Sequence, residues 1–176
     1  RGSGTMAIKL GKLYGVEVIV TCGSDAKCDA AKARGADHAI NYNSTDFVEA
    51  VKAITGGAGV HIVLDMVAGS YVPRNLQCLR EDGRHVTIAV QGGMVAEINM
   101  AQVMMRRLTL TGSTLRPRTA AFKALLALEI YQSVWPMVTD GALRPEMNRI
   151  FPLREAAAAH AYMESGDHVG KIILEV

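Results

Sequence analysis

The sequence predicts an α/β fold in which a doubly wound parallel sheet carries helices on both faces. Three observations lead to this prediction. Short β-branched and aliphatic runs alternate with helical segments of about ten residues, which is typical of βαβ crossovers. Glycines or helix-capping residues stand at most boundaries. Hydrophobic residues make up 49% of the 176 residues and charged residues 20%, as in globular chains with a core.

The strands are predicted from apolar runs that are too short for buried helices. The first, VEVIVTC, is rich in β-branched residues, and LTLTGSTL alternates threonine with leucine. In chain order the predicted strands are 16–22, 38–42, 60–67, 84–90, 108–115, 148–153 and 171–176.

The helices are predicted from apolar spacing and from their ends. Gly15 and Gly35 are C-terminal stops, and Ser24 or Asp25 caps the second helix. Ser44 or Thr45 is the expected cap of the third. In chain order the predicted helices are 5–14, 26–35, 44–55, 70–82, 100–107, 119–140 with a bend at Pro136, and 154–166.

One strand of the expected sheet is missing from this pattern. The strand order of a dinucleotide-binding sheet is 3-2-1-4-5-6, so strand 1 is central, and the helix at 5–14 would follow it. Without strand 1, strands 2 and 4 would each leave backbone groups unpaired, at about 1–3 kcal/mol per buried group. We therefore expect further sequence upstream of Arg1 in the parent protein.

Two domains are expected from the change of pattern near residue 140. Residues 1–140 carry the alternating strands and helices of a cofactor-binding domain. Residues 141–176 carry one helix and two short strands, which we expect to pack outside the main sheet.

Charge and composition exclude several classes of partner. A net charge of +2 argues against nucleic acid, and no apolar run is long enough for a membrane span. Three cysteines without a C-x-x-C pair favour a reducing, cytoplasmic location. The histidines show no metal-ligand spacing, and no nucleophile–base pair stands out. We therefore expect no metal site and no protein catalytic group.

The opening residues resemble a phosphate-binding turn. Gly2, Ser3 and Gly4 precede a helix, whose free N–H groups and dipole favour a pyrophosphate. Taken alone the spacing is weak, because a flexible chain end would look the same.

The end of the second strand favours NADP over NAD. NAD-binding proteins usually place an acidic residue there for the ribose 2′-OH. Here Gly23 and Ser24 leave room and Lys27 adds a positive charge, while Asp25 lies past the strand end. The alternative is that Ser24 only caps the helix and that Lys27 is a solvated side chain. Tyr42, at the end of the neighbouring strand, completes a cluster suited to a 2′-phosphate, although it could equally be a packing residue.

With these residues in view, the chain resembles the zinc-independent NAD(P)H:quinone oxidoreductase branch of the medium-chain dehydrogenase/reductase superfamily, whose cofactor domain is Rossmann-like. The stretches that carry the resemblance are GTMAIKLGKLYGVEVIVTCGSDAK, RGADHAINYNSTDFVEAVKAITGGAGVHIVLDMVAGSY, LTLTGSTLRPRT and AHAYMESGDHVGKIILEV. Together they span essentially the whole chain.

The resemblance implies NADP(H) as the cofactor and assigns residues to it. Ser24, Lys27 and Tyr42 match the positions that hold the 2′-phosphate. Gly2 and Gly4 match the last glycines of the family's phosphate-binding turn. The positions that match cofactor-lining segments are Met66, Val67, Ile88, Ala89, Val90, Gln91, Ser113 and Thr114, and we expect their neighbours Ser3, Gly23 and Leu115 at the cofactor as well.

The resemblance also implies an activity and partners. In the family, hydride passes directly from nicotinamide to a quinone or enone acceptor, and members often dimerise through the strand that matches 108–115. An N-terminal GroES-like domain supplies much of the substrate pocket, so we expect little turnover from these residues alone. Two alternatives remain open: a non-catalytic nucleotide-binding or dimerising module, and the cofactor domain of an alcohol dehydrogenase-type enzyme.

Overall fold

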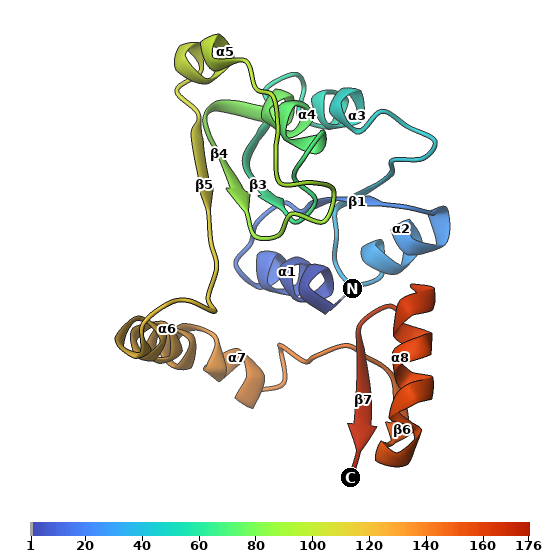
Figure 1. Ribbon diagram of the computed structural model, residues 1–176. Helices are drawn as coiled ribbons and strands as arrows, with labels where there is room; N and C mark the ends of the chain where they lie inside the picture. Colours follow the sequence, from blue (N-terminus) through green and yellow to red (C-terminus); the bar gives the residue numbers. More distant parts are fainter. Residues whose placement is uncertain (1) are drawn as a thin grey trace. The chain divides into compact units, whose positions relative to one another are not determined.

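The computed structural model describes residues Gly2–Val176, which divide into two compact units (Figure 1). The first holds the residues up to Ser44 together with Ala127–Val176, and the second holds Thr45–Leu126. The predicted domain boundary at residue 140 stays a prediction. No helix in the described part is long and apolar enough to cross a membrane.

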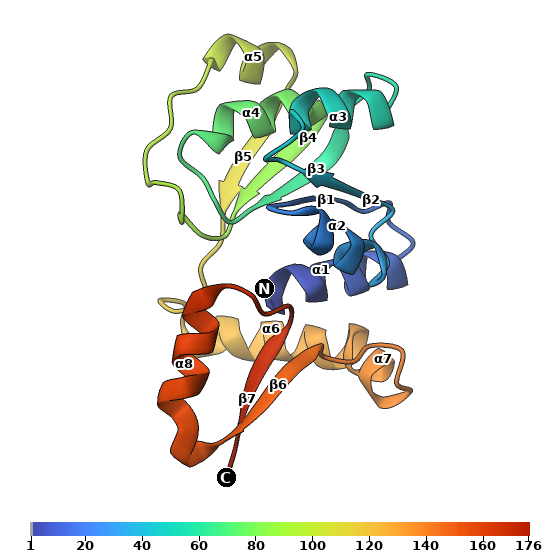
Figure 2. The ribbon, with the colours of Figure 1, turned by 90° about the vertical axis from the view of Figure 1, so that its right-hand side faces the viewer.

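The second unit is built on a parallel three-stranded sheet of order β3-β4-β5. Figure 2 shows helices α3 and α4 side by side next to this sheet. The bounds are α3 (Phe47–Ile54), β3 (Val60–Asp65), α4 (Tyr71–Cys78), β4 (Leu79–Thr87), α5 (Met100–Met105) and β5 (Thr109–Gly112). Leu76 and Leu79, both fully buried, form the centre of its core with Val72 and Leu108. Burying each leucine contributes about 1.5–3 kcal/mol.

The helix predicted over 70–82 is wrong at its end, because α4 stops at Cys78 and β4 begins at Leu79. Leu79 pairs with Val60 and is fully buried, so the chain turns into the sheet as soon as this side chain reaches the core. The expected turn at Asp82 lies inside β4 as an irregularity in the register, with Asp82 at φ 58°.

The helix cap predicted at Ser44 or Thr45 is also wrong. Asp46 caps α3, since its carboxylate accepts hydrogen bonds from the N–H of Val48 at 2.8 Å and of Glu49 at 3.4 Å. The Val48 bond is the main reason why the pKa of Asp46 lies below its ordinary value. A carboxylate at a helix N-terminus meets both the unpaired N–H groups and the helix dipole.

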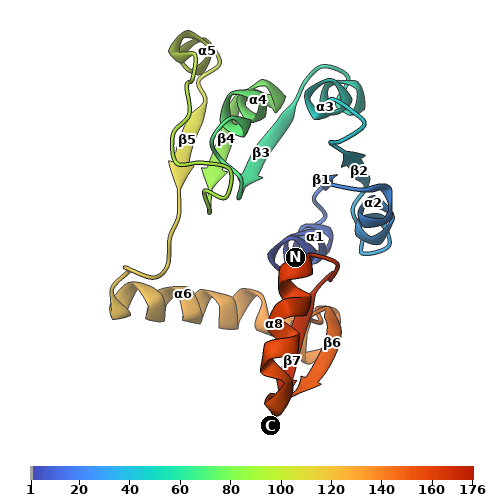
Figure 3. The same cartoon turned by 45° about the vertical axis from the view of Figure 1, so that its right-hand side comes forward.

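The first unit contains a parallel pair, β1 (Ile19–Cys22) and β2 (His38–Asn41), connected by α2 (Asp25–Lys32) (Figure 3). Helix α1 (Gly2–Leu13) buries Ile8 in a small core with Ala31 and Ala36.

The C-terminal part of the first unit forms a separate parallel pair. Figure 3 shows α8 lying along β6 and β7. The bounds are α7 (Trp135–Thr139), β6 (Met147–Pro152), a short 3-10 turn (Leu153–Glu155), α8 (Ala156–Ser165) and β7 (Lys171–Glu175).

The helix predicted over 119–140 is two helices. Helix α6 (Ala120–Ser133) ends before Val134, and α7 begins at Trp135 with Pro136 in its first turn. Proline has no N–H to continue the ladder and its ring clashes with the preceding turn, so the break precedes the proline.

The strand order within each unit agrees with part of a doubly wound sheet. Taking strand 1 out of the order 3-2-1-4-5-6 leaves a pair and a trio, and the structure has β1-β2 and β3-β4-β5 in those roles. Within Gly2–Val176, β1 and β3 are not paired with each other. The predicted α/β, Rossmann-like fold class is confirmed.

Candidate cofactor-binding site

The glycine-rich start of the chain lies in the first turn of α1. The predicted turn before a helix is therefore wrong in position, because Gly2, Ser3 and Gly4 are already helical. The Thr5 hydroxyl donates to the Gly2 carbonyl at 3.0 Å and closes this turn. The N–H groups of a first helical turn have no partner within the helix, so the capacity to bind an anion remains.

Lys171 stands beside this helix terminus and was missed by sequence reasoning. A methyl group placed on Gly2 would lie 2.8 Å from Lys171 Nζ, which shows how close the ammonium comes to the first residue of α1. A cation at the positive end of a helix dipole is unfavourable unless an anion lies between them. No sequence spacing could have paired these residues, because β7 lies at the other end of the chain.

Ser24 and Lys27 are arranged by the cap of α2. Ser24 has extended backbone angles, and its Oγ accepts a hydrogen bond from the Lys27 N–H at 3.3 Å. This is the capping role expected as the alternative, and it leaves the hydroxyl proton of Ser24 able to donate. Lys27 Nζ donates to the Gly166 carbonyl at 3.2 Å, which holds the ammonium near the loop after α8.

Gly23 and Tyr42 are in direct contact at the ends of β1 and β2. A Cβ on Gly23 would lie 2.7 Å from the Tyr42 hydroxyl oxygen, so a larger residue at position 23 would have to displace the phenol. The structure therefore brings together the two strand ends that the sequence analysis combined. Asn43 Nδ2 donates to the Gly23 carbonyl at 2.8 Å and ties the two loops together.

The acidic side chain nearest this cluster has its own partner. Asp25 Oδ1 accepts a hydrogen bond from Asn41 Nδ2 at 2.8 Å.

Cys22, the last residue of β1, has its pKa raised to about 11, first by burial and then by Cys28, so it is a neutral thiol at physiological pH.

In the second unit, the predicted residues Met66 and Val67 lie beside the loop that follows β4. The N–H of Gln91 donates to the Met66 carbonyl at 3.3 Å, and that of Gly92 to the Val67 carbonyl at 2.7 Å. Residues 91–92 thus pair with residues 66–67 through their backbones.

The segment after β5 lies at the same edge of its sheet. The Ser113 N–H donates to the Thr87 carbonyl at 3.0 Å, which places it beside the end of β4. Thr114 and Leu115 follow and are exposed. The roles of all these residues in binding a cofactor stay predictions.

A family described as zinc-binding dehydrogenase matches residues 2–129. The chain belongs to this family. Its place in the medium-chain dehydrogenase/reductase superfamily, predicted from the sequence, is confirmed.

Several relatives of the chain are oxidoreductases. The 2-haloacrylate reductase of a Burkholderia species is 32% identical over 177 residues, which is 98% of this chain and 52% of the reductase. The crystal structure of Escherichia coli quinone oxidoreductase complexed with NADPH matches with a TM-score of 0.84 at 29% identity, over 99% of this chain and 54% of that one. A structure named as an NAD-dependent alcohol dehydrogenase matches with a TM-score of 0.77 at 30% identity, over 98% and 47%.

The chain therefore spans about half the length of these relatives.

Zinc, which the family's description suggests, does not fit the described residues of this member. Among Gly2–Val176 no group of three or more His, Cys, Asp or Glu side chains is arranged to hold a metal ion. A zinc site needs three or four such ligands.

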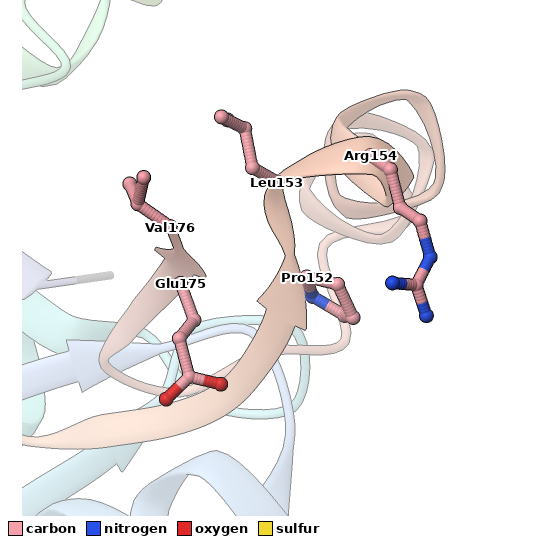
Figure 4. A pocket seen from close by; sticks show the side chains of 5 residues that line it. All are labelled: Pro152, Leu153, Arg154, Glu175 and Val176. Carbon is pink, nitrogen blue, oxygen red and sulfur yellow. The ribbon is translucent and has the colours of Figure 1, made fainter.

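A pocket of about 440 Å³ lies at the ends of β6 and β7 (Figure 4). It is lined by Pro152, Leu153, Arg154, Glu175 and Val176. None of these residues belongs to the predicted cofactor site.

Proposed function

We propose that the chain is the cofactor-binding part of a zinc-independent oxidoreductase that uses NADPH to reduce a quinone or an enone. The observation that carries the proposal is the cluster at the ends of β1 and β2, where Gly23 contacts Tyr42 and Ser24 and Lys27 share the start of α2. Family membership and an NADPH-bound relative support it.

The chemistry of this cluster suits a 2′-phosphate better than a free ribose. Ser24 and Tyr42 offer hydroxyl donors and Lys27 an ammonium, all of which favour a dianion. NAD-binding relatives of this fold hold the ribose hydroxyl with a carboxylate. The nearest one here, Asp25, is bonded to Asn41.

The start of α1 is the proposed place of the pyrophosphate. Its free N–H groups, with Lys171 beside Gly2, present partial and full positive charge together.

The residues described have a binding and orienting role in this mechanism. A bound NADPH would supply the hydride that reduces the acceptor. The strand-end loops hold the cofactor, and orientation with exclusion of water replaces acid–base catalysis. No described residue is assigned a catalytic proton transfer.

The test is calorimetric titration with NADPH and with NADH. Tighter binding of NADPH is expected, since only NADPH carries the 2′-phosphate. Equal affinities, or tighter NADH binding, would overturn the assignment and favour an alcohol dehydrogenase-type cofactor domain.

The acceptor is proposed only as a class. A haloacrylate reductase and a quinone oxidoreductase both resemble the chain, and both names denote conjugated, electron-poor acceptors. Steady-state assays with a quinone, an enone and an alcohol as alternative substrates of the natural protein would separate these classes.

A homodimer through β5 is proposed as well. All four residues of β5 are exposed, and in the part of the chain described β5 pairs with β4 alone. An open strand edge is a template for pairing with a second chain. Sedimentation velocity tests it, and a monomer at micromolar concentration would contradict it.

A cytoplasmic location is also proposed. All three cysteines are free, which supports it.

A further inference from the structure

Three buried polar side chains meet beneath the strand-end loops of the second unit. They are Asp65 at the end of β3, Asn75 in α4 and His85 in β4, exposed by 3%, 8% and 2%. Burying polar groups costs free energy unless each is paired. The cluster touches solvent so little that it cannot itself be a ligand site.

The Asp65 carboxylate accepts four hydrogen bonds. Its Oδ2 lies 3.0 Å from both Asn75 Nδ2 and His85 Nε2, and the imidazole donates in the tautomer that carries its proton there. Its Oδ1 accepts from the backbone N–H groups of Val67 at 2.7 Å and Ala68 at 3.0 Å. The two side chains thus fix a carboxylate that in turn fixes a turn of backbone.

The turn held in this way is conformationally demanding. Ala68 has φ 58°, a left-handed conformation that residues other than glycine adopt at a cost. Ala68 is also buried, so its conformation depends on its N–H bond and its surroundings.

The same turn carries the loop that follows β4. The Asp65 carbonyl accepts from the Ile88 N–H at 2.7 Å, in addition to the bonds from Gln91 and Gly92 described above. A Cβ on Gly69 would lie 2.5 Å from the Gly92 carbonyl oxygen, so the two loops are packed backbone to backbone. A displacement of one loop must therefore displace the other.

We propose that Asp65, Asn75 and His85 are positioning residues that hold loops 66–69 and 88–93 in the shape that binds the cofactor. Stability alone does not explain a cluster of this kind, because buried polar networks are often weak net contributors to it. What apolar residues could not do is accept the N–H groups of Val67 and Ala68 and fix their direction. The inference rests on the proposed function, since these loops carry predicted cofactor-lining residues.

The test compares three variants of the natural protein that carries these residues. His85→Leu removes the donor, and His85→Gln keeps a donor near the position of Nε2. Val51→Ala, in the core of α3, is the control for a general loss of stability. Each is measured for its NADPH dissociation constant, its unfolding in urea, and the hydrogen exchange of the Val67 and Ala68 amides.

His85→Leu is expected to raise the NADPH dissociation constant about tenfold, the effect of losing one hydrogen bond to a charged group. It should also speed exchange at Val67 and Ala68. His85→Gln should recover most of both, and Val51→Ala should lower stability alone.

The inference is overturned if His85→Leu resembles Val51→Ala in every measurement, or if glutamine rescues nothing. A wild-type protein that binds no NADPH would remove the proposed function and the cofactor role assigned to these loops. The exchange data would then still decide separately whether the cluster holds the turn.

Discussion

The strand ends of the two units, where we propose that the cofactor binds, differ in the groups that they expose. At β1 and β2 the chain presents side chains: a serine hydroxyl, a lysine and a tyrosine that is 42% exposed. At β3 and β4 it presents backbone groups. Their orientation is fixed by the buried Asp65 carboxylate, which is bonded to Asn75 and His85. Charged and polar side chains select a ligand by its charge, whereas a fixed backbone sets the shape of a binding site. Mutations at the first place should therefore change cofactor preference, and mutations at the second should change stability and loop conformation.

The largest effect is expected for Asp65→Ala. Removing the carboxylate leaves Asn75, His85 and two backbone N–H groups buried without their acceptor, and such a loss costs about 3–5 kcal/mol of unfolding free energy. Urea denaturation measures it. The exposed carboxylate of Glu49, changed to glutamine, is the control and should shift stability by under about 0.5 kcal/mol. Similar values for the two variants would show that the buried cluster does not hold its unit together.

Lys27→Ala should change which cofactor is preferred. The loss of an ammonium at the 2′-phosphate costs about 1.5–3 kcal/mol of NADPH binding and leaves NADH binding nearly unchanged. Calorimetry with both cofactors measures this, and Lys32→Ala, at the other end of α2, is the matched control. Equal weakening of the two cofactors by Lys27→Ala would place Lys27 elsewhere than at the 2′-phosphate.

Lys171→Ala should weaken both cofactors alike, because the pyrophosphate is common to them. Its ammonium acts near the dipole of α1, so a loss of about 1 kcal/mol, or roughly fivefold in affinity, is expected. The contrast with Lys27→Ala separates a contact that selects NADPH over NADH from a contact that both cofactors share. A change confined to NADPH would contradict it.

The smallest effect is expected in how the free energy of unfolding falls at acid pH. Lys9 above all, and then Arg34, hold the pKa of Glu146 below its ordinary value of 4.5. The stabilisation is therefore complete above that value and is lost as the pH falls through the lower, folded pKa. Glu146→Gln should flatten the fall in unfolding free energy below pH 4.5, by a few tenths of a kcal/mol because these ion pairs are partly exposed. If the variant lost stability below pH 4.5 as the wild type does, other carboxylates would dominate the acid denaturation.

Sequence reasoning worked where structure is local. The alternation of strands and helices predicted the fold class, because hydrophobic period and turn residues act over a few positions. Ser24 as a cap followed from its place three residues before the N–H it bonds. The end of α4 was missed because burial of Leu79, a tertiary effect, outweighed helix propensity.

By itself the sequence determined the order of elements and the polar residues that stand at the ends of β1 and β2. Only the tertiary structure decided that Lys171 lies against Gly2 and that His85 and Asn75 meet on Asp65. The physical reason is that such contacts depend on strand register and on how distant segments pack. A residue's type records what it can bond, while its partner is fixed only when the chain has folded.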